Sequence, residues 1–139
     1  MKKILIVDDS PFIRLVLRGI VEKTVPGSQV LEADSGTAAF KQFKKAVPDL
    51  VLLDIIMPEG EDEGVDVLKR MRDAVPQTKI VMITAVGHDA MINRCKELGV
   101  EDYIVKPFDD AQIEQVLNKY IERERERVKK QKATEMTDS

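Results

Sequence analysis

The sequence has one cysteine and lacks any long apolar run. Cys95 alone cannot form an intramolecular disulfide, which suits a reducing compartment. No stretch approaches the roughly 20 apolar residues that a membrane-spanning helix needs, and Ile4–Val7 is too short for the core of a signal peptide. The 22 basic and 25 acidic residues nearly balance at a net charge of −3, which gives no indication of nucleic-acid binding. We therefore expect a cytoplasmic protein that neither inserts into a membrane nor binds nucleic acid.

Five short apolar runs alternate with stretches of helical spacing. The runs are nearly continuous in apolar character, which is typical of parallel strands covered on both faces. Strands are predicted at Lys3–Val7, Gln29–Glu32, Leu50–Leu53, Lys79–Ile83 and Asp102–Val105, and helices at Phe12–Lys23, Gly36–Lys45, Gly64–Asp73, Asp89–Leu98 and after Asp109. Strict alternation of this kind predicts an α/β fold, an open sheet with helices on both faces. Ser10 and Ser35 are suitable N-caps for the first two helices.

Chemically reactive side chains stand where these strands end. The first strand is followed by Asp8 and Asp9, the third by Asp54, the fourth by Thr84 and the fifth by Lys106. Open α/β sheets bind ligands at the carboxyl ends of their strands. If the sheet reverses direction after the second strand, all five groups converge on one crevice. Three close carboxylates repel one another without a cation, and hard oxygen ligands suit Mg²⁺. The lysine and the threonine hydroxyl could then hold an anion opposite the metal. The set therefore describes a site for a phosphoryl group beside Mg²⁺.

Four short segments resemble the receiver domains of two-component response regulators, single-domain chemotaxis regulators among them. They are Ile-Val-Asp-Asp-Ser at 6–10, Asp-Ile-Ile-Met-Pro at 54–58, Thr-Ala at 84–85 and Lys-Pro-Phe at 106–108. The resemblance runs from about residue 2 to residue 120 in the family's order and spacing. It implies a flavodoxin-like, doubly wound sheet of five parallel strands in the order 2-1-3-4-5 with five flanking helices.

The resemblance also implies a role for each matching residue. Asp54 would be the phosphoacceptor that attacks a phosphohistidine, and Lys106 would pair with a phosphoryl oxygen. Asp9, Asp54 and the backbone carbonyl of Ile56 would bind Mg²⁺, with Asp8 acting mostly through water. The protein would then be a switch that phosphorylates and slowly dephosphorylates itself, rather than an enzyme acting on other substrates.

Further residues carry the switching expected of this family. Thr84 would move toward the phosphoryl group, and Tyr103 would follow by changing rotamer. Ile56 and Val86 would flank the path of the hydrolytic water, and both are apolar. The Lys106–Pro107 peptide bond is expected to be cis.

The implied partners are a sensor histidine kinase or phosphotransfer protein and a downstream effector. The effector would bind the face made by the helix at 89–98, the strand at 102–105 and the last helix. We expect a receiver domain at 1–122, followed by a charged helical extension and disordered tail at 123–139. The protein would be a monomer or a phosphorylation-dependent dimer.

One segment departs from the family pattern. Residues 59–63 separate Pro58 from Gly64, two more than the family usually has there, and they are strongly acidic. We interpret this run as a solvated loop, His88 as an exposed residue at a helix start, and Cys95 as a core residue.

Three other functions compete with a phosphorylation switch. A small aspartate-nucleophile phosphohydrolase commonly carries a general-acid aspartate two residues after its nucleophile, where this chain has Ile56. A degenerate receiver that serves only as a scaffold would not need the intact set of acidic residues. A nucleotide-binding Rossmann protein is disfavoured because no glycine-rich loop follows the first strand.

Overall fold

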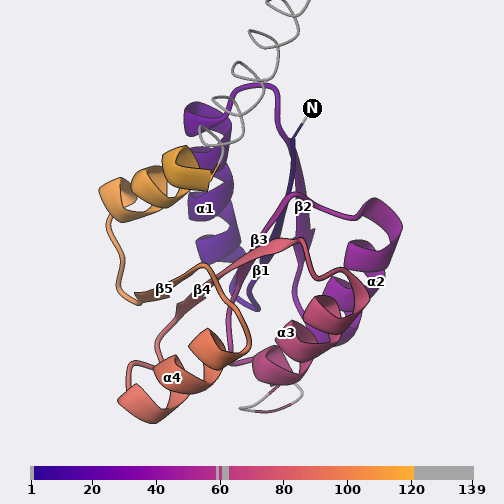
Figure 1. Cartoon of the computed structure of the whole chain (residues 1–139). Coiled ribbons are helices and arrows are strands. Elements are labelled where there is room, and N and C mark those ends of the chain that lie inside the picture. Colours follow the sequence, from indigo (N-terminus) through magenta and orange to yellow (C-terminus); the bar gives the residue numbers. More distant parts are fainter. Residues whose placement is uncertain (1, 59, 61–62, 121–139) are drawn as a thin grey trace, which may run out of the picture.

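The computed structural model describes residues 2–58, 60 and 63–120 of the chain. In this part of the chain, five parallel strands form one sheet of order β2-β1-β3-β4-β5 (Figure 1). The strands are β1 (Lys3–Val7), β2 (Gln29–Ala33), β3 (Leu50–Leu53), β4 (Lys79–Thr84) and β5 (Asp102–Val105). The flavodoxin-like strand order expected from the sequence is therefore confirmed.

Helices cover both faces of the sheet (Figure 1). They are α1 (Pro11–Thr24), α2 (Gly36–Ala46), α3 (Glu63–Ala74) and α4 (Asp89–Glu97), and residues 110–120 form a further helical segment. On one face, Leu17 of α1 and Leu117 of the segment 110–120 share a core with β1, β3, β4 and β5. On the other face, Phe43, Leu68 and Cys95 of α2, α3 and α4 form a second core against the sheet. Cys95 is thus a core residue, as the sequence indicated.

Burial differs between the central and the edge strands. All residues of β3 are buried, and so are all of β1 except Lys3 and all of β4 except Lys79. The prediction that all five strands are covered on both faces was wrong for β2 and β5. Each of these has only one neighbouring strand, so that Gln29 and Val105 are exposed.

Local signals in the sequence account for where the helices begin. The hydroxyl oxygen of Ser10 accepts a hydrogen bond from Ile13 N, and that of Ser35 accepts one from Ala38 N. Both serines therefore cap orphan N–H groups, as predicted. His88 is exposed, but it also caps α4, because its Nδ1 accepts a hydrogen bond from Met91 N at 3.3 Å.

Helix ends lie within one residue of the predicted limits. The strands β2 and β4 each extend one residue further than predicted, to Ala33 and Thr84. The predicted charged extension and tail at 123–139 lie outside the described residues. No helix in the described part of the chain combines the length and apolar character that a bilayer crossing requires.

Candidate functional site

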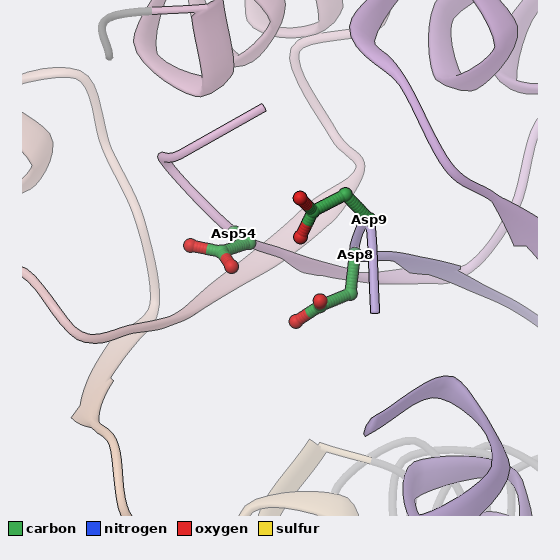
Figure 2. A group of neighbouring side chains, drawn as sticks. All are labelled: Asp8, Asp9 and Asp54. Carbon is green, nitrogen blue, oxygen red and sulfur yellow. The ribbon is translucent and has the colours of Figure 1, made fainter. Parts of the chain in front are cut away.

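Three carboxylates meet at the carboxyl ends of β1 and β3. These strands are neighbours and pair Val7 with Leu53, so the residues that follow them lie side by side. Asp8, Asp9 and Asp54 each place one carboxylate oxygen within 4.8 Å of the others. Figure 2 shows the three side chains gathered around a common space. The three carboxylates expected at these strand ends therefore lie together.

Lys106 bridges two of these carboxylates. Its ammonium group lies 2.6 Å from Asp8 Oδ2 and 2.9 Å from Asp54 Oδ2. The lysine follows β5, and its peptide bond with Pro107 is cis, as the resemblance implied. Charge-assisted contacts of this length are among the strongest hydrogen bonds in proteins. The bridge ties the site to a residue 98 positions away from Asp8 in the sequence.

Burial and charge act against each other in this cluster. Burial raises the pKa of the Asp8 carboxyl, although the contact with Lys106 opposes the rise. Burial also works against the charged form of Lys106, but its hydrogen bonds to Asp8 and Asp54 outweigh burial and raise the pKa of the ammonium group. Lys106 therefore stays charged at neutral pH.

The main chain orients two of the carboxylates. Asp54 Oδ1 accepts a hydrogen bond from Ile56 N at 3.2 Å, and Asp8 Oδ1 accepts one from Ser10 N at 2.9 Å. Asp9 is exposed, and its carboxylate has no hydrogen-bond or salt-bridge partner among residues 2–58, 60 and 63–120. Asp8 and Asp54 are thus held in place, while Asp9 has a carboxylate free to accept a ligand.

The chemistry of this donor set fits a divalent cation. The cluster has three carboxylates and one ammonium group, which pairs with two of them, so it carries excess negative charge when ionised. All the side-chain donors are hard oxygens, and one of the three carboxylates is open to solvent. Such a site suits Mg²⁺, which binds to a few carboxylates and retains several waters.

Thr84 and Tyr103 are linked through the residue between them in space, Val86. Thr84 is buried, and its Oγ1 accepts a hydrogen bond from Val86 N at 3.3 Å. The hydroxyl of Tyr103 donates to the carbonyl oxygen of Val86. Burial, with smaller contributions from Cys95 and Asp54, raises the pKa of Tyr103 to about 12. The phenol is therefore a donor throughout the physiological pH range.

Gly64 supports the main chain that carries Asp54, a role that the sequence analysis did not identify. Its N–H donates to Ile55 O at 2.8 Å. A Cβ atom at position 64 would lie 2.2 Å from Asp54 O and 2.4 Å from Ile55 Cα, so only glycine fits. The Gly that follows the Met-Pro pair in the family pattern could have pointed to this contact. The contact is made despite the longer segment after Pro58.

Ile56 and Val86 follow Asp54 and Thr84 by two positions. Ile56 is 41% exposed and Val86 is partly buried, and both side chains are apolar.

Within the acidic segment, Gly60 pairs with Met57, whereas residues 59, 61 and 62 lie outside the described residues. The interpretation of the whole segment as a solvated loop therefore stays a prediction.

The sheet order and the position of the acidic cluster and Lys106 at its carboxyl edge place the protein among the flavodoxin-like α/β proteins. Comparison with known families assigns it more closely: residues 4–118 match the response regulator receiver domain. The chain belongs to this family.

Relatives and solved structures agree with this assignment. The chain is 39% identical to the chemotaxis protein CheY of Thermotoga maritima over 85% of this chain and 96% of the relative. It is 40% identical to the sporulation initiation phosphotransferase F of Bacillus subtilis, over 86% and 94% of the two chains. Among solved structures, a CheY-like receiver domain from Methanospirillum hungatei superposes with a TM-score of 0.79 at 28% identity, covering 91% of this chain and 98% of that one. Chemotaxis protein CheY4 of Vibrio cholerae gives a TM-score of 0.76 at 28% identity, covering 86% and 98%.

Proposed function

We propose that this protein is a phosphorylation-activated response regulator in which Asp54 accepts a phosphoryl group from a phosphohistidine. The observation that carries the proposal is the pairing of a buried Asp54 with Lys106 on one side and the Asp8–Asp9 pair on the other. The donor would be a sensor histidine kinase or a phosphotransfer protein. The cytoplasm is the expected location.

The transfer forms an O–P bond between a carboxylate oxygen of Asp54 and phosphorus. The N–P bond of the donor breaks, and the imidazole nitrogen leaves with the electron pair and takes up a proton. Asp9, Asp54 and the backbone carbonyl of Ile56 would hold Mg²⁺, with Asp8 acting mostly through water. When bound, the ion supplies positive charge opposite the phosphoryl oxygens.

Lys106 supplies the second positive charge. Before transfer its ammonium group spans Asp8 and Asp54. Once Asp54 is phosphorylated, its carboxyl group is part of an acyl phosphate and loses its own negative charge, and the transferred phosphoryl group brings new negative charge next to Lys106. The same ammonium group can then stabilise a phosphoryl oxygen while it keeps its contact with Asp8.

Activation would pass from Thr84 to Tyr103. A Thr84 hydroxyl that turns to the phosphoryl group leaves Val86 N without its acceptor. The segment after β4 then rearranges, and Tyr103 loses its partner at Val86 O. The phosphoryl charge supplies the free-energy difference between the two states, so the change is a population shift.

The downstream effector would bind the face formed by α4, β5 and the helical segment 110–120, where Tyr103 lies. A phosphorylation-dependent dimer formed through the same face is the alternative to a monomer. A phosphohydrolase is less well supported, because Ile56 cannot donate a proton. A protein that serves only as a scaffold would not need Lys106 to pair with both Asp8 and Asp54.

The proposal is tested by incubating the protein with acetyl phosphate and Mg²⁺ and locating the adduct by mass spectrometry. We expect one phosphoryl group, on Asp54, and none on the Asp54→Asn variant. An adduct on that variant, or none on the parent protein, would contradict the proposal. Turnover of small phosphate esters by the parent protein would support the phosphohydrolase instead.

A further inference from the structure

Arg14 of α1 contacts the main chain of the acidic pair. Its Nη1 donates a hydrogen bond to the carbonyl oxygen of Asp8 at 2.7 Å. The N–H of Asp8 donates to Ala33 O, so the main chain of this residue is bonded on both sides. The carbonyl of Asp8 belongs to the peptide group that joins Asp8 to Asp9. Arg14 therefore fixes the plane of the one peptide bond shared by two of the three acidic residues.

Glu32 holds Arg14 in place for this contact. Its Oε1 lies 3.1 Å from Arg14 Nε. The other oxygen, Oε2, lies 2.8 Å from Arg18, which is one turn further along α1. Glu32 is the next-to-last residue of β2, where it pairs with Ile6 of β1, so its position is set by the sheet. The planar guanidinium of Arg14 is therefore held at Nε by Glu32 while Nη1 contacts Asp8, and such a pre-organised group loses little freedom per hydrogen bond formed.

The contact matters most for Asp9. The side chain of Asp8 is already held by Ser10 N and Lys106, whereas the exposed carboxylate of Asp9 has no such partner in the described part of the chain. Only the main chain aims the Asp9 carboxylate toward Asp54. Mutating a residue that holds a metal ligand in place, without contacting the metal itself, typically lowers metal affinity by roughly 10- to 100-fold.

We propose that Arg14 is a positioning residue, which sets the cation affinity of the site by holding the Asp8–Asp9 peptide so that Asp9 faces Asp54. This inference rests on the proposed function, since it concerns the Mg²⁺ that phosphoryl transfer requires. It extends the site beyond the strand ends to a contact between α1 and β2.

The sign of the effect separates positioning from simple electrostatics. Removing a positive charge near a cation site strengthens cation binding if charge alone matters. Removing a group that aims a ligand weakens it. Arg18 provides a matched control, because it shares Glu32 with Arg14 but makes no contact with Asp8.

The test is a Mg²⁺ titration without phosphodonor, followed through the backbone amide NMR signals of Asp9 and Asp54. The variants are Arg14→Ala, Arg14→Met, which keeps an apolar stem without donors, and Arg18→Ala. Thermal melting of each variant gives its folded population, and Arg14→Met alone carries the test should Arg14→Ala not fold. We expect both Arg14 variants to bind Mg²⁺ roughly tenfold more weakly than the parent protein. Arg18→Ala should bind within about twofold of the parent, the scale of a screened surface charge.

Unchanged or tighter binding in the Arg14 variants would overturn the role of Arg14 alone. An equal loss in Arg18→Ala would also overturn it, since the effect would then come through Glu32. Absence of Mg²⁺ binding in the parent protein would overturn both this inference and the proposed cation. Normal binding in the parent without phosphorylation of Asp54 would contradict only the proposed transfer.

Discussion

The hydroxyl of Tyr103 donates a hydrogen bond to the main-chain carbonyl of Val86. The N–H of the same valine donates to the side chain of Thr84, so one residue connects the buried hydroxyl at the end of β4 to a half-buried phenol in β5. In the proposed switch, a change at Thr84 can therefore reach Tyr103 through Val86 alone. The N–H and the carbonyl of Val86 would both have to change their partners.

Breaking the path at Thr84 should uncouple the phosphorylation site from Tyr103. Beryllofluoride with Mg²⁺ mimics the phosphorylated aspartate. In the parent protein it should shift the amide NMR signals of Asp54, Val86 and Tyr103. In Thr84→Ala, the shift at Asp54 should remain and that at Tyr103 should largely vanish, because no hydroxyl can turn to the mimic. Ser has the same hydroxyl, so Thr84→Ser should restore the shift. Shifts confined to the acidic cluster in the parent protein would refute the path.

High pH should weaken the fold through Tyr103. Burial raises its folded-state pKa to about 12, above the value of about 10 for an unfolded tyrosine. The stability linked to this phenol is therefore fully present below pH 10 and is lost as the pH rises toward 12. Urea unfolding at pH 9, 10 and 11 should show a smaller pH-dependent loss for Tyr103→Phe than for the parent protein. Parallel losses in the two proteins would exclude Tyr103 as the source.

Mg²⁺ binding without phosphodonor should be weak and should depend on Asp9. Mg²⁺ keeps several waters, and the site offers only a few protein ligands. Titration of Asp9→Ala should show a large loss of affinity. Asp73→Ala should be unaffected, because this exposed residue of α3 lies outside the cluster. Parent-like affinity in Asp9→Ala would show that the ion binds elsewhere.

A methyl group at position 64 should destabilise the protein. It would overlap the carbonyl of Asp54 and Cα of Ile55, and overpacking of this kind costs about 1–3 kcal/mol. Gly19 lies within α1 with nothing within 4 Å of an added Cβ. Gly19→Ala should therefore raise the free energy of unfolding by about 0.5–1 kcal/mol. Urea denaturation of the two variants measures the loss of stability expected for Gly64→Ala and the gain expected for Gly19→Ala. A Gly64→Ala variant as stable as the parent protein would disprove the close approach.

The aspartyl phosphate should be long-lived. Ile56 and Val86 are both apolar and cannot orient a hydrolytic water, and one lost orienting contact of about 1.4 kcal/mol slows a reaction tenfold. The double variant Ile56→Asn, Val86→Glu should release phosphate roughly tenfold faster or more once the donor is removed. Val47→Asn changes another exposed apolar side chain, at the end of α2, and should leave the rate unchanged. No acceleration in the double variant would show that these side chains do not control the water.

Local patterns in the sequence were enough to predict the helices, the strands and the chemistry of the site. Apolar runs and helical spacing depend on residues a few positions apart, so the strand at Lys3–Val7 and the caps at Ser10 and Ser35 could be predicted from local pattern alone. The acidic residues could be placed because parallel strands bring their carboxyl ends to one edge of a sheet.

The contacts between residues far apart in the sequence became clear only from the packing of the folded chain. Lys106 bridges Asp8 and Asp54, Gly64 lies against the main chain of Asp54, and Arg14 reaches the carbonyl of Asp8. A polar residue on an amphipathic helix has the same sequence signature whether it faces water or a main-chain carbonyl. Its partner depends on the packing of α1 against β1 and β2, which no local periodicity encodes.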